Sequence, residues 1–182
     1  MTLARPPAGE FPPAGEFPPY AEKYTSLVPD DVLGALEQQA PQTVQLYSER
    51  QEADGDFRYA PDKWSAKEVL GHIIDTERIF TYRALRAARR DRTPMEGFEQ
   101  DDYVRNGGFG HRALKSLIEE YQSVRAASIT LFRSFSGDTW TARVIANQHE
   151  ISVRALAFMT AGHELHHVKI LRERYFPLRQ HA

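Results

Sequence analysis

A helix-opening signal lies in the first half of the chain, where residues 64–75 read Trp64-Ser65-Ala66-Lys67-Glu68-Val69-Leu70-Gly71-His72-Ile73-Ile74-Asp75. Ser65, followed three residues later by Glu68, forms a capping box, in which each side chain satisfies the backbone N–H of the other residue. The apolar residues that follow recur at helical spacing, and His72 falls among them. We therefore expect a long amphipathic helix from Ser65 to about Arg89, with a histidine on its inner face.

Three further segments show the same periodicity. Asp30 or Asp31 can cap the first, which contains Pro41 and is therefore expected to be kinked or split. The second has heptad-like apolar spacing from about His111 to Phe135, and the third begins after a capping Ser152. Four long amphipathic helices without a sustained alternating pattern predict an all-α fold, a four-helix bundle.

The N-terminal 28 residues have a different character from the rest. The hexapeptide Pro-Pro-Ala-Gly-Glu-Phe occurs at 6–11 and again at 12–17, and prolines at this density favour an extended polyproline II conformation. We expect residues 1–28 to form a mobile or loosely docked arm and residues 29–182 to form one domain. The connection at about 92–110 is long, glycine-rich and aromatic, which makes it a candidate functional loop.

Composition excludes several classes of function. The net charge is -2, which provides no electrostatic basis for nucleic-acid binding. The chain has no cysteine, so disulfides, thiol nucleophiles and thiolate ligands are absent, and a metal site must use histidine and carboxylates. No apolar run approaches the ~18 residues of a membrane span, and no signal peptide is recognisable. We therefore expect a cytoplasmic protein with neither nucleic-acid nor membrane partners.

The last expected helix contains His163-Glu164-Leu165-His166-His167. Residues four apart lie on one face of a helix, so His163 and His167 can reach one metal ion. The same letters satisfy H-E-x-x-H, the zinc-protease helix, in which the glutamate is the general base. No H-x-x-G-x-x-H extension follows in 168–182, and Glu173 would point away from the pair. The third ligand must come from upstream, and His72 is the best candidate. This pattern disfavours a metalloprotease.

The three histidines occupy positions where the periodicity calls for apolar residues. Each buried imidazole without a partner would cost about 1–3 kcal/mol, whereas one divalent ion satisfies all three. A ferritin-like di-iron site needs further inward carboxylates that the other helices do not provide. Glu164, next to a ligand, is a candidate catalytic base or hydrogen-bond acceptor for a ligand. Asp75, three residues after His72, is a candidate acceptor as well. Solvated helix positions are the alternative for both carboxylates, and His166 is expected to lie off the site.

These motifs, Trp64-Ser65 with Glu68 to Asp75 and then Ser152 to Leu156 with Gly162 to His167, resemble the DinB-like superfamily over residues 30–176. The resemblance implies a four-helix bundle in which His72, His163 and His167 hold a divalent ion, commonly zinc or nickel, with iron or manganese as further options. The superfamily includes YfiT-type metal-dependent hydrolases and S-transferases that use bacillithiol or mycothiol. Its name reflects DNA-damage induction of some members, which suggests a role in stress response.

Together these observations predict a metal-dependent enzyme that activates a small thiol, as an S-transferase, or water, as a hydrolase. A non-enzymatic bundle, with a structural metal or a ligand-sensing role, remains the alternative. The expected partner is a small-molecule substrate, with a low-molecular-weight thiol as a candidate. We also expect a homodimer, in which Ile129, Leu171 and Tyr175 would be covered by a second copy.

Overall fold

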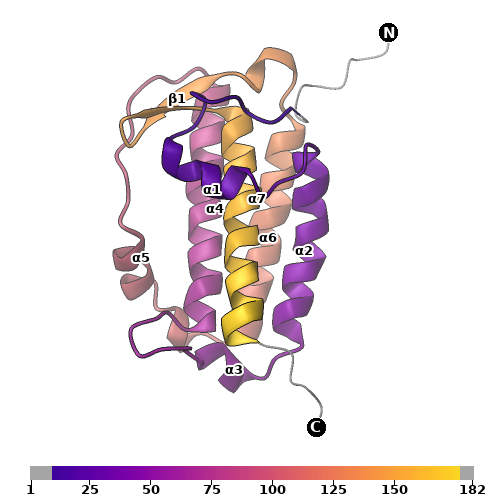
Figure 1. Cartoon of the computed structure of the whole chain (residues 1–182), viewed down its shortest axis with the longest axis vertical. Helices are drawn as coiled ribbons and strands as arrows, with labels where there is room; N and C mark the ends of the chain where they lie inside the picture. The colour runs from indigo at the N-terminus through magenta and orange to yellow at the C-terminus, as the bar shows by residue number, and fades with distance from the viewer. Residues whose placement is uncertain (1–9, 177–182) are drawn as a thin grey trace.

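The computed structural model describes residues 10–176. Four long helices lie side by side and form the bundle in Figure 1, which confirms the expected all-α class. They are α2 (Val32–Ser48), α4 (Ala66–Ala88), α6 (Leu114–Arg133) and α7 (Val153–Ile170). The shorter helices are α1 (Glu22–Thr25), α3 (Glu52–Asp56) and α5 (Gln100–Asn106), and a π-helical turn (Leu171–Tyr175) continues α7.

The caps expected from the sequence are present. Ser65 and Glu68 form the reciprocal capping box of α4, Asp31 accepts from the Gly34 N–H at 3.0 Å, and Ser152 accepts from the Ala155 N–H at 3.0 Å. These side chains satisfy backbone donors that the first helical turn leaves without partners. Pro41 lies inside α2 without splitting it.

A polar layer crosses the bundle and divides its core. One hydrophobic cluster, which includes Leu36, Phe132 and Phe158, lies toward the β-hairpin end, and the other, which includes Leu70 and Leu117, lies toward the opposite end. All four bundle helices contribute buried polar side chains to the layer between them: Gln39, Thr43, His72, Thr76, Glu77, Arg125, Ser128, Thr160, His163 and Glu164. Buried polar groups need partners, and the candidate site residues His72, His163 and Glu164 all belong to this layer.

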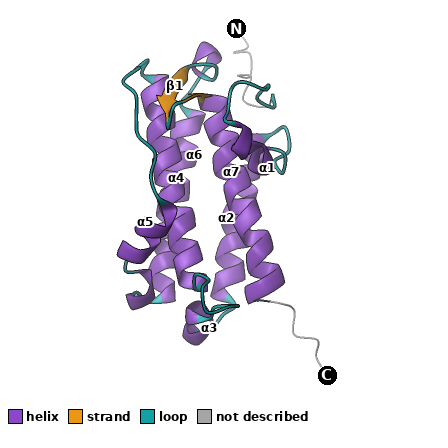
Figure 2. Ribbon diagram, turned by 60° about the vertical axis from the view of Figure 1, so that its left-hand side comes forward, coloured by secondary structure: helices purple, strands orange, loops and turns teal. Residues whose placement is uncertain are grey.

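A small antiparallel hairpin, which the sequence did not indicate, closes one end of the bundle. It consists of β1 (Arg143–Ala146) and β2 (His149–Ser152). The turn residues Asn147 and Gln148 have φ of 48° and 65°, the left-handed conformation that tight hairpin turns require. The hairpin holds the long connection after α4, because the Met95 N–H donates to Ile145 and the Asn147 N–H donates to Met95. Figure 2 shows this connection descending along the outside of the bundle to α5.

The described part of the N-terminal arm, residues 10–28, packs on the bundle, so the expectation of a mobile or loosely docked arm was wrong there. Glu16 is 5% exposed and forms a buried ion pair with Arg154, in which Arg154 Nε donates to Oε2 at 2.6 Å. Thr25 of α1 is fully buried against the bundle. The sequence could not show this pair because its members are 138 residues apart. Residues 1–9, including most of the first hexapeptide, lie outside the described residues.

Two of the three residues expected at a dimer interface are buried within the single chain. Leu171 and Tyr175 are 0% and 7% exposed within the single chain, because the π-helical turn directs them into the second hydrophobic cluster. Of the three residues that we expected a second copy to cover, Ile129 alone keeps intermediate exposure. The homodimer therefore stays a prediction without these two contacts. None of the described helices is both long and apolar enough to cross a membrane.

Candidate metal centre

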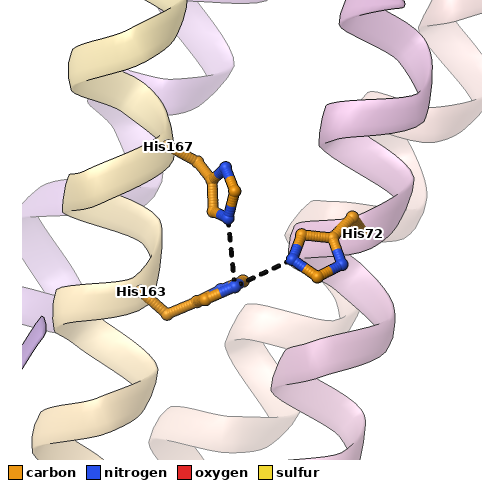
Figure 3. A group of neighbouring side chains, drawn as sticks. All are labelled: His72, His163 and His167. Carbon is orange, nitrogen blue, oxygen red and sulfur yellow. Dashed lines mark hydrogen bonds between the residues drawn. The ribbon is translucent and has the colours of Figure 1, made fainter. Parts of the chain in front are cut away.

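Three histidines from two helices meet in the polar layer. His72 comes from α4, and His163 and His167 come from successive turns of α7. Figure 3 shows the three rings directed toward one another. The Nε2 atom of His163 lies 2.9 Å from Nε2 of His72 and 3.1 Å from Nε2 of His167. All three predicted ligands are therefore brought together, with ligand atoms within 4.8 Å of one another.

Glycine precedes two of these histidines and allows close packing around them. A Cβ on Gly162 would lie 2.1 Å from the backbone oxygen of Tyr24, and a Cβ on Gly71 would lie 2.4 Å from the ring of Phe109. Both distances are far below van der Waals contact, so a larger residue would push α1 or Phe109 away. These glycines therefore fix how closely the neighbouring segments approach the histidine-bearing turns.

The donor set fits a divalent metal ion. An imidazole nitrogen offers one in-plane position, either a proton or a lone pair, so His163 Nε2 cannot satisfy both neighbouring nitrogens by hydrogen bonding. A single ion can accept all three lone pairs. Two imidazole nitrogens bound to one tetrahedral zinc ion at about 2.0–2.1 Å lie about 3.4 Å apart, close to the two shorter separations. All three ligand atoms lie within 4.8 Å of one another, so one ion can contact all of them.

Burial keeps these rings neutral. It lowers the pKa of His72 from 6.5 to about 4. Burial also holds the pKa values of His163 and His167 well below 6.5, with the neighbouring histidines adding to the effect. A neutral imidazole has the free lone pair that metal binding requires.

Side chains around the histidines orient them. The Thr76 hydroxyl lies 3.5 Å from Nδ1 of His72, the nitrogen opposite the one directed at the site. The Trp64 ring packs on His72 with centroids 4.8 Å apart, and Tyr24 packs edge-on against His163 at 5.5 Å. A partner on the second nitrogen holds a ligand ring in place. Sequence reasoning missed Thr76 as this partner, although its position four residues after His72 on one helix face could have revealed it.

Glu164 points into a different network. Its carboxylate accepts from Tyr121 at 2.6 Å, from Thr43 and from Arg125, and Arg125 also pairs with Glu77. Among the described residues, no histidine donates to Glu164. Burial alone would lower the pKa of Arg125, but the two glutamates hold it well above its usual range. These contacts give the predicted base or acceptor role of Glu164 no support.

Asp75 lies on α4, three residues after His72, and is partly exposed. Its side chain is 27% exposed and its Oδ1 is 3.5 Å from Arg78. Burial raises the pKa of this carboxyl, and nearby Glu120 adds to that effect while Arg78 opposes it. Within the described chain, no hydrogen bond joins Asp75 to His72, whose second nitrogen faces Thr76 instead. This structure thus gives no support to the predicted acceptor role of Asp75 toward His72, which stays a prediction.

The histidines can be reached from outside the bundle. His72 and His163 line a cleft of about 310 Å³. Its walls include Tyr20 and Tyr24 from the N-terminal segment and the stretch Gly97–Gln100 from the long connection, so that loop does line the site. A second hollow, of about 280 Å³, reaches His167 beside Trp64 and Tyr175. The centre is thus accessible to small molecules.

The other polar candidates take structural positions. His166 has intermediate exposure and packs on Tyr24, outside the three-histidine cluster as expected. Arg154 pairs with Glu16. Of the arginines at the end of α4, Arg86 pairs with Asp91, whereas Arg83 is buried and faces the cleft.

Comparison with known proteins identifies the family of this chain. The family model described as the DinB superfamily matches residues 35–171, a range that covers nearly all of the bundle and all three histidines. The chain belongs to the DinB superfamily. A comparison with curated protein sequences found no match.

Two solved proteins share the fold of this DinB-superfamily chain. YfiT from Bacillus subtilis, described as "a probable metal-dependent hydrolase with an unusual four-helix bundle topology", is 15% identical, with a TM-score of 0.71 over 92% of this chain and 95% of that one. The mycothiol-dependent maleylpyruvate isomerase is also 15% identical, with a TM-score of 0.64 over 79% of this chain and 61% of that one. A variant of that isomerase aligns similarly, with a TM-score of 0.65 and 14% identity. At these identities the likeness establishes the fold alone.

Proposed function

We propose that this protein is a mononuclear divalent-metal enzyme that activates a small thiol for transfer to a second substrate. His72, His163 and His167 would hold the ion, with zinc or nickel as the expected metal and iron or manganese as further options. The observation that carries the proposal is the position of the cluster, since His72 and His163 line a cleft large enough for a small molecule. A purely structural ion would need no such access.

The donor set determines the chemistry that is available. A divalent ion held by three neutral imidazoles keeps its full charge and lowers the pKa of a thiol or water bound beside it. The chain's own residues supply orientation and shelter. Thr76 holds the second nitrogen of His72, while Trp64 and Tyr24 cover two ligand rings. Shielding from bulk water strengthens the electrostatic interactions inside the cleft.

Thiol activation is favoured over water activation by the contacts of Glu164. Hydrolysis by an H-E-x-x-H helix uses the glutamate as a base, but here that carboxylate is bound by Tyr121 and Arg125 in the core. A thiol whose pKa is lowered on binding can release its proton to solvent and is then the nucleophile, so this route does not use the Glu164 carboxylate. The mycothiol-dependent activity in the name of one structural relative supports the same choice.

Hydrolysis is the second candidate. The structural relative that aligns over 95% of its own length is described as a probable metal-dependent hydrolase. In this alternative Asp75, whose pKa is raised by burial, is the other carboxylate that the sequence offers as a partner of the site. The non-enzymatic alternative is a metal-containing stress-response or ligand-binding bundle, in which the ion is either closed to exogenous ligands or binds them without reaction.

Cobalt substitution tests these alternatives. A cobalt–thiolate bond gives an intense near-ultraviolet band, which a chain without cysteine cannot produce by itself. We expect 2-mercaptoethanol to generate the band in the cobalt-loaded protein. His163→Ala should abolish the band. The matched variant His166→Ala, which removes a histidine of the same helix outside the three-histidine cluster, should retain it. If no band forms but a water ionisation near neutral pH is detected, hydrolysis becomes the leading function. If neither ligand reaches the cobalt, the enzyme proposal is refuted.

A further inference from the structure

The cleft that His72 and His163 line also contains a buried arginine. Arg83 is 5% exposed and lines the same cleft as His72 and His163. Its guanidinium donates one hydrogen bond, from Nη2 to the backbone oxygen of Glu96 at 3.2 Å, and lies 5.9 Å from the ring centroid of Phe98. A guanidinium has five N–H donors, so most of its hydrogen-bonding capacity is not used by the described residues.

No carboxylate compensates this charge in the described part of the chain. The other buried arginines have such partners: Arg125 pairs with Glu77 and Glu164, and Arg154 pairs with Glu16. Glu99 also lines the cleft, but it is exposed and forms no ion pair with Arg83. Burial lowers the pKa of Arg83, and the groups that partly offset this effect are Tyr20 and Tyr103. A buried, uncompensated arginine is costly unless a ligand completes its contacts.

The separation of the two ends of the cleft indicates the size of such a ligand. His72 and Arg83 are eleven positions apart on α4, which corresponds to about 16 Å along the helix axis. Side chains lean toward the N-terminus of their helix, so His72 and Arg83 are displaced in the same direction, the longer arginine further than the histidine. The gap between the two groups is therefore on the order of 10–15 Å. Thr76 and the apolar Phe80 lie between these two positions on α4, and Phe98 of the long connection lines the same cleft.

We infer that the cleft binds an elongated small-molecule carboxylate, whose anionic end is bound by Arg83 while its reactive end lies at the three histidines. Planar carboxylates match the forked donors of a guanidinium. The apolar middle of the cleft would accommodate a chain or ring between the two ends. This inference rests on the proposed function, because it takes the histidine end as the reactive one. The carboxylate can belong either to the thiol or to the molecule that receives it.

A matched set of probes tests the inference on the zinc-loaded protein by isothermal titration calorimetry. Mercaptooctanoate and mercaptooctanol have the same length, about 10 Å, and differ only in the end that would meet Arg83. We expect the carboxylate to bind roughly 10- to 100-fold more tightly, which is the range for a charge-assisted bidentate contact. Mercaptoacetate and 2-mercaptoethanol are too short to span the cleft, so their affinities should differ little.

Variants assign the preference to the arginine. Arg83→Gln should make the two long probes bind alike, and Arg83→Lys should keep part of the preference. The matched control is Arg89→Gln, which removes an exposed arginine at the end of the same helix. A purely structural role of Arg83, in holding Glu96 and Phe98, would weaken both probes equally and leave their ratio unchanged. Equal binding of the long probes to the unmodified protein, or an undiminished preference in Arg83→Gln, would overturn the inference.

The same experiment separates the two proposals. Mercaptooctanol and 2-mercaptoethanol are each compared on the zinc protein and on His163→Ala. If each thiol binds both proteins with the same affinity, it does not bind through the metal. The thiol-activation proposal then fails, whether or not a carboxylate is preferred. Octanoate and octanol, which lack sulfur, then test the arginine alone. A preference for octanoate that Arg83→Gln removes would sustain the anionic subsite, and the absence of any preference would refute it. If the thiols bind through the metal but no carboxylate is preferred, the proposed function stands and the subsite is rejected.

Discussion

Replacing Glu164 by alanine should destabilise the protein strongly. Glu164 and its partner Arg125 are 1% and 0% exposed, and the carboxylate also accepts from Tyr121 and Thr43. Removing one member of a buried ion pair typically costs about 3–5 kcal/mol. Arg125 would keep its pairing with Glu77, which places the expected loss near the lower end of that range. For a domain of this size each kcal/mol corresponds to about 3 °C, so a loss near 3 kcal/mol should lower the melting temperature by about 9 °C.

Glu164→Gln should cost less, and the difference has a structural reason. The hydroxyls of Tyr121 and Thr43 can rotate to accept from the new amide N–H₂, while the amide oxygen still accepts from Arg125. We expect a loss of about 1–3 kcal/mol, from the missing charge on the arginine's partner. The matched control is Glu173→Gln, an exposed carboxylate just beyond the same helix, which should melt like the unmodified protein.

Differential scanning calorimetry of the metal-free and zinc-loaded forms provides the measurement. The expected order of melting temperatures is unmodified protein, then Glu164→Gln, then Glu164→Ala, with zinc still bound by each folded variant. The reasoning is refuted if Glu164→Ala melts within about 2 °C of the unmodified protein. If Glu164→Gln keeps its stability and metal but loses the cobalt–thiolate band, the glutamate acts at the metal after all.

Three further outcomes are expected. His72→Ala should lose most bound divalent metal by elemental analysis while its circular dichroism stays helical; full occupancy would mean that the third ligand is misassigned. Gly162→Ala should displace Tyr24, because the new Cβ would lie 2.1 Å from its backbone oxygen, and should lower stability by about 1–3 kcal/mol. Gly110→Ala, with no atom near its Cβ position, is the control, and equal melting of both variants would contradict the packing argument. Glu16 has a pKa below its usual 4.5, because the hydrogen bonds from Arg154 and Ser152 outweigh the raising effect of burial. A lowered pKa contributes stability above pH 4.5 that is lost on acidification, so Glu16→Gln should melt with a shallower pH dependence below that value; parallel curves would rule this contribution out.

Local sequence signals predicted the helices because the decisive interactions are themselves local. The boxes and caps at Ser65, Asp31 and Ser152 each join residues three positions apart. The spacing of His163 and His167 on one face follows from helix geometry alone. The sequence did not indicate the β-hairpin, whose strands are only four residues each. A strand of that length offers too few positions for an alternating pattern to stand out.

The candidate site residues also divide into those set by local sequence and those set by distant contacts. The three histidines were predictable because their positions interrupt an apolar periodicity. The surroundings of Glu164 were not, because its partners Thr43 and Arg125 lie 121 and 39 residues away. Nothing in the local pattern distinguishes a carboxylate that faces a metal from one that faces a buried arginine on the other side of the same helix.

The sequence by itself therefore determined the class of fold, the four helices and the two faces that carry the histidines, since each depends on contacts within a few residues. Only the tertiary structure decided which polar side chains meet. It docked Glu16 on Arg154, enclosed Leu171 and Tyr175, bound Glu164 in the core, and opened a cleft from the histidines to Arg83. These outcomes depend on helices that are distant in sequence but pack together, because burial in a shared core requires every polar group to find a partner there.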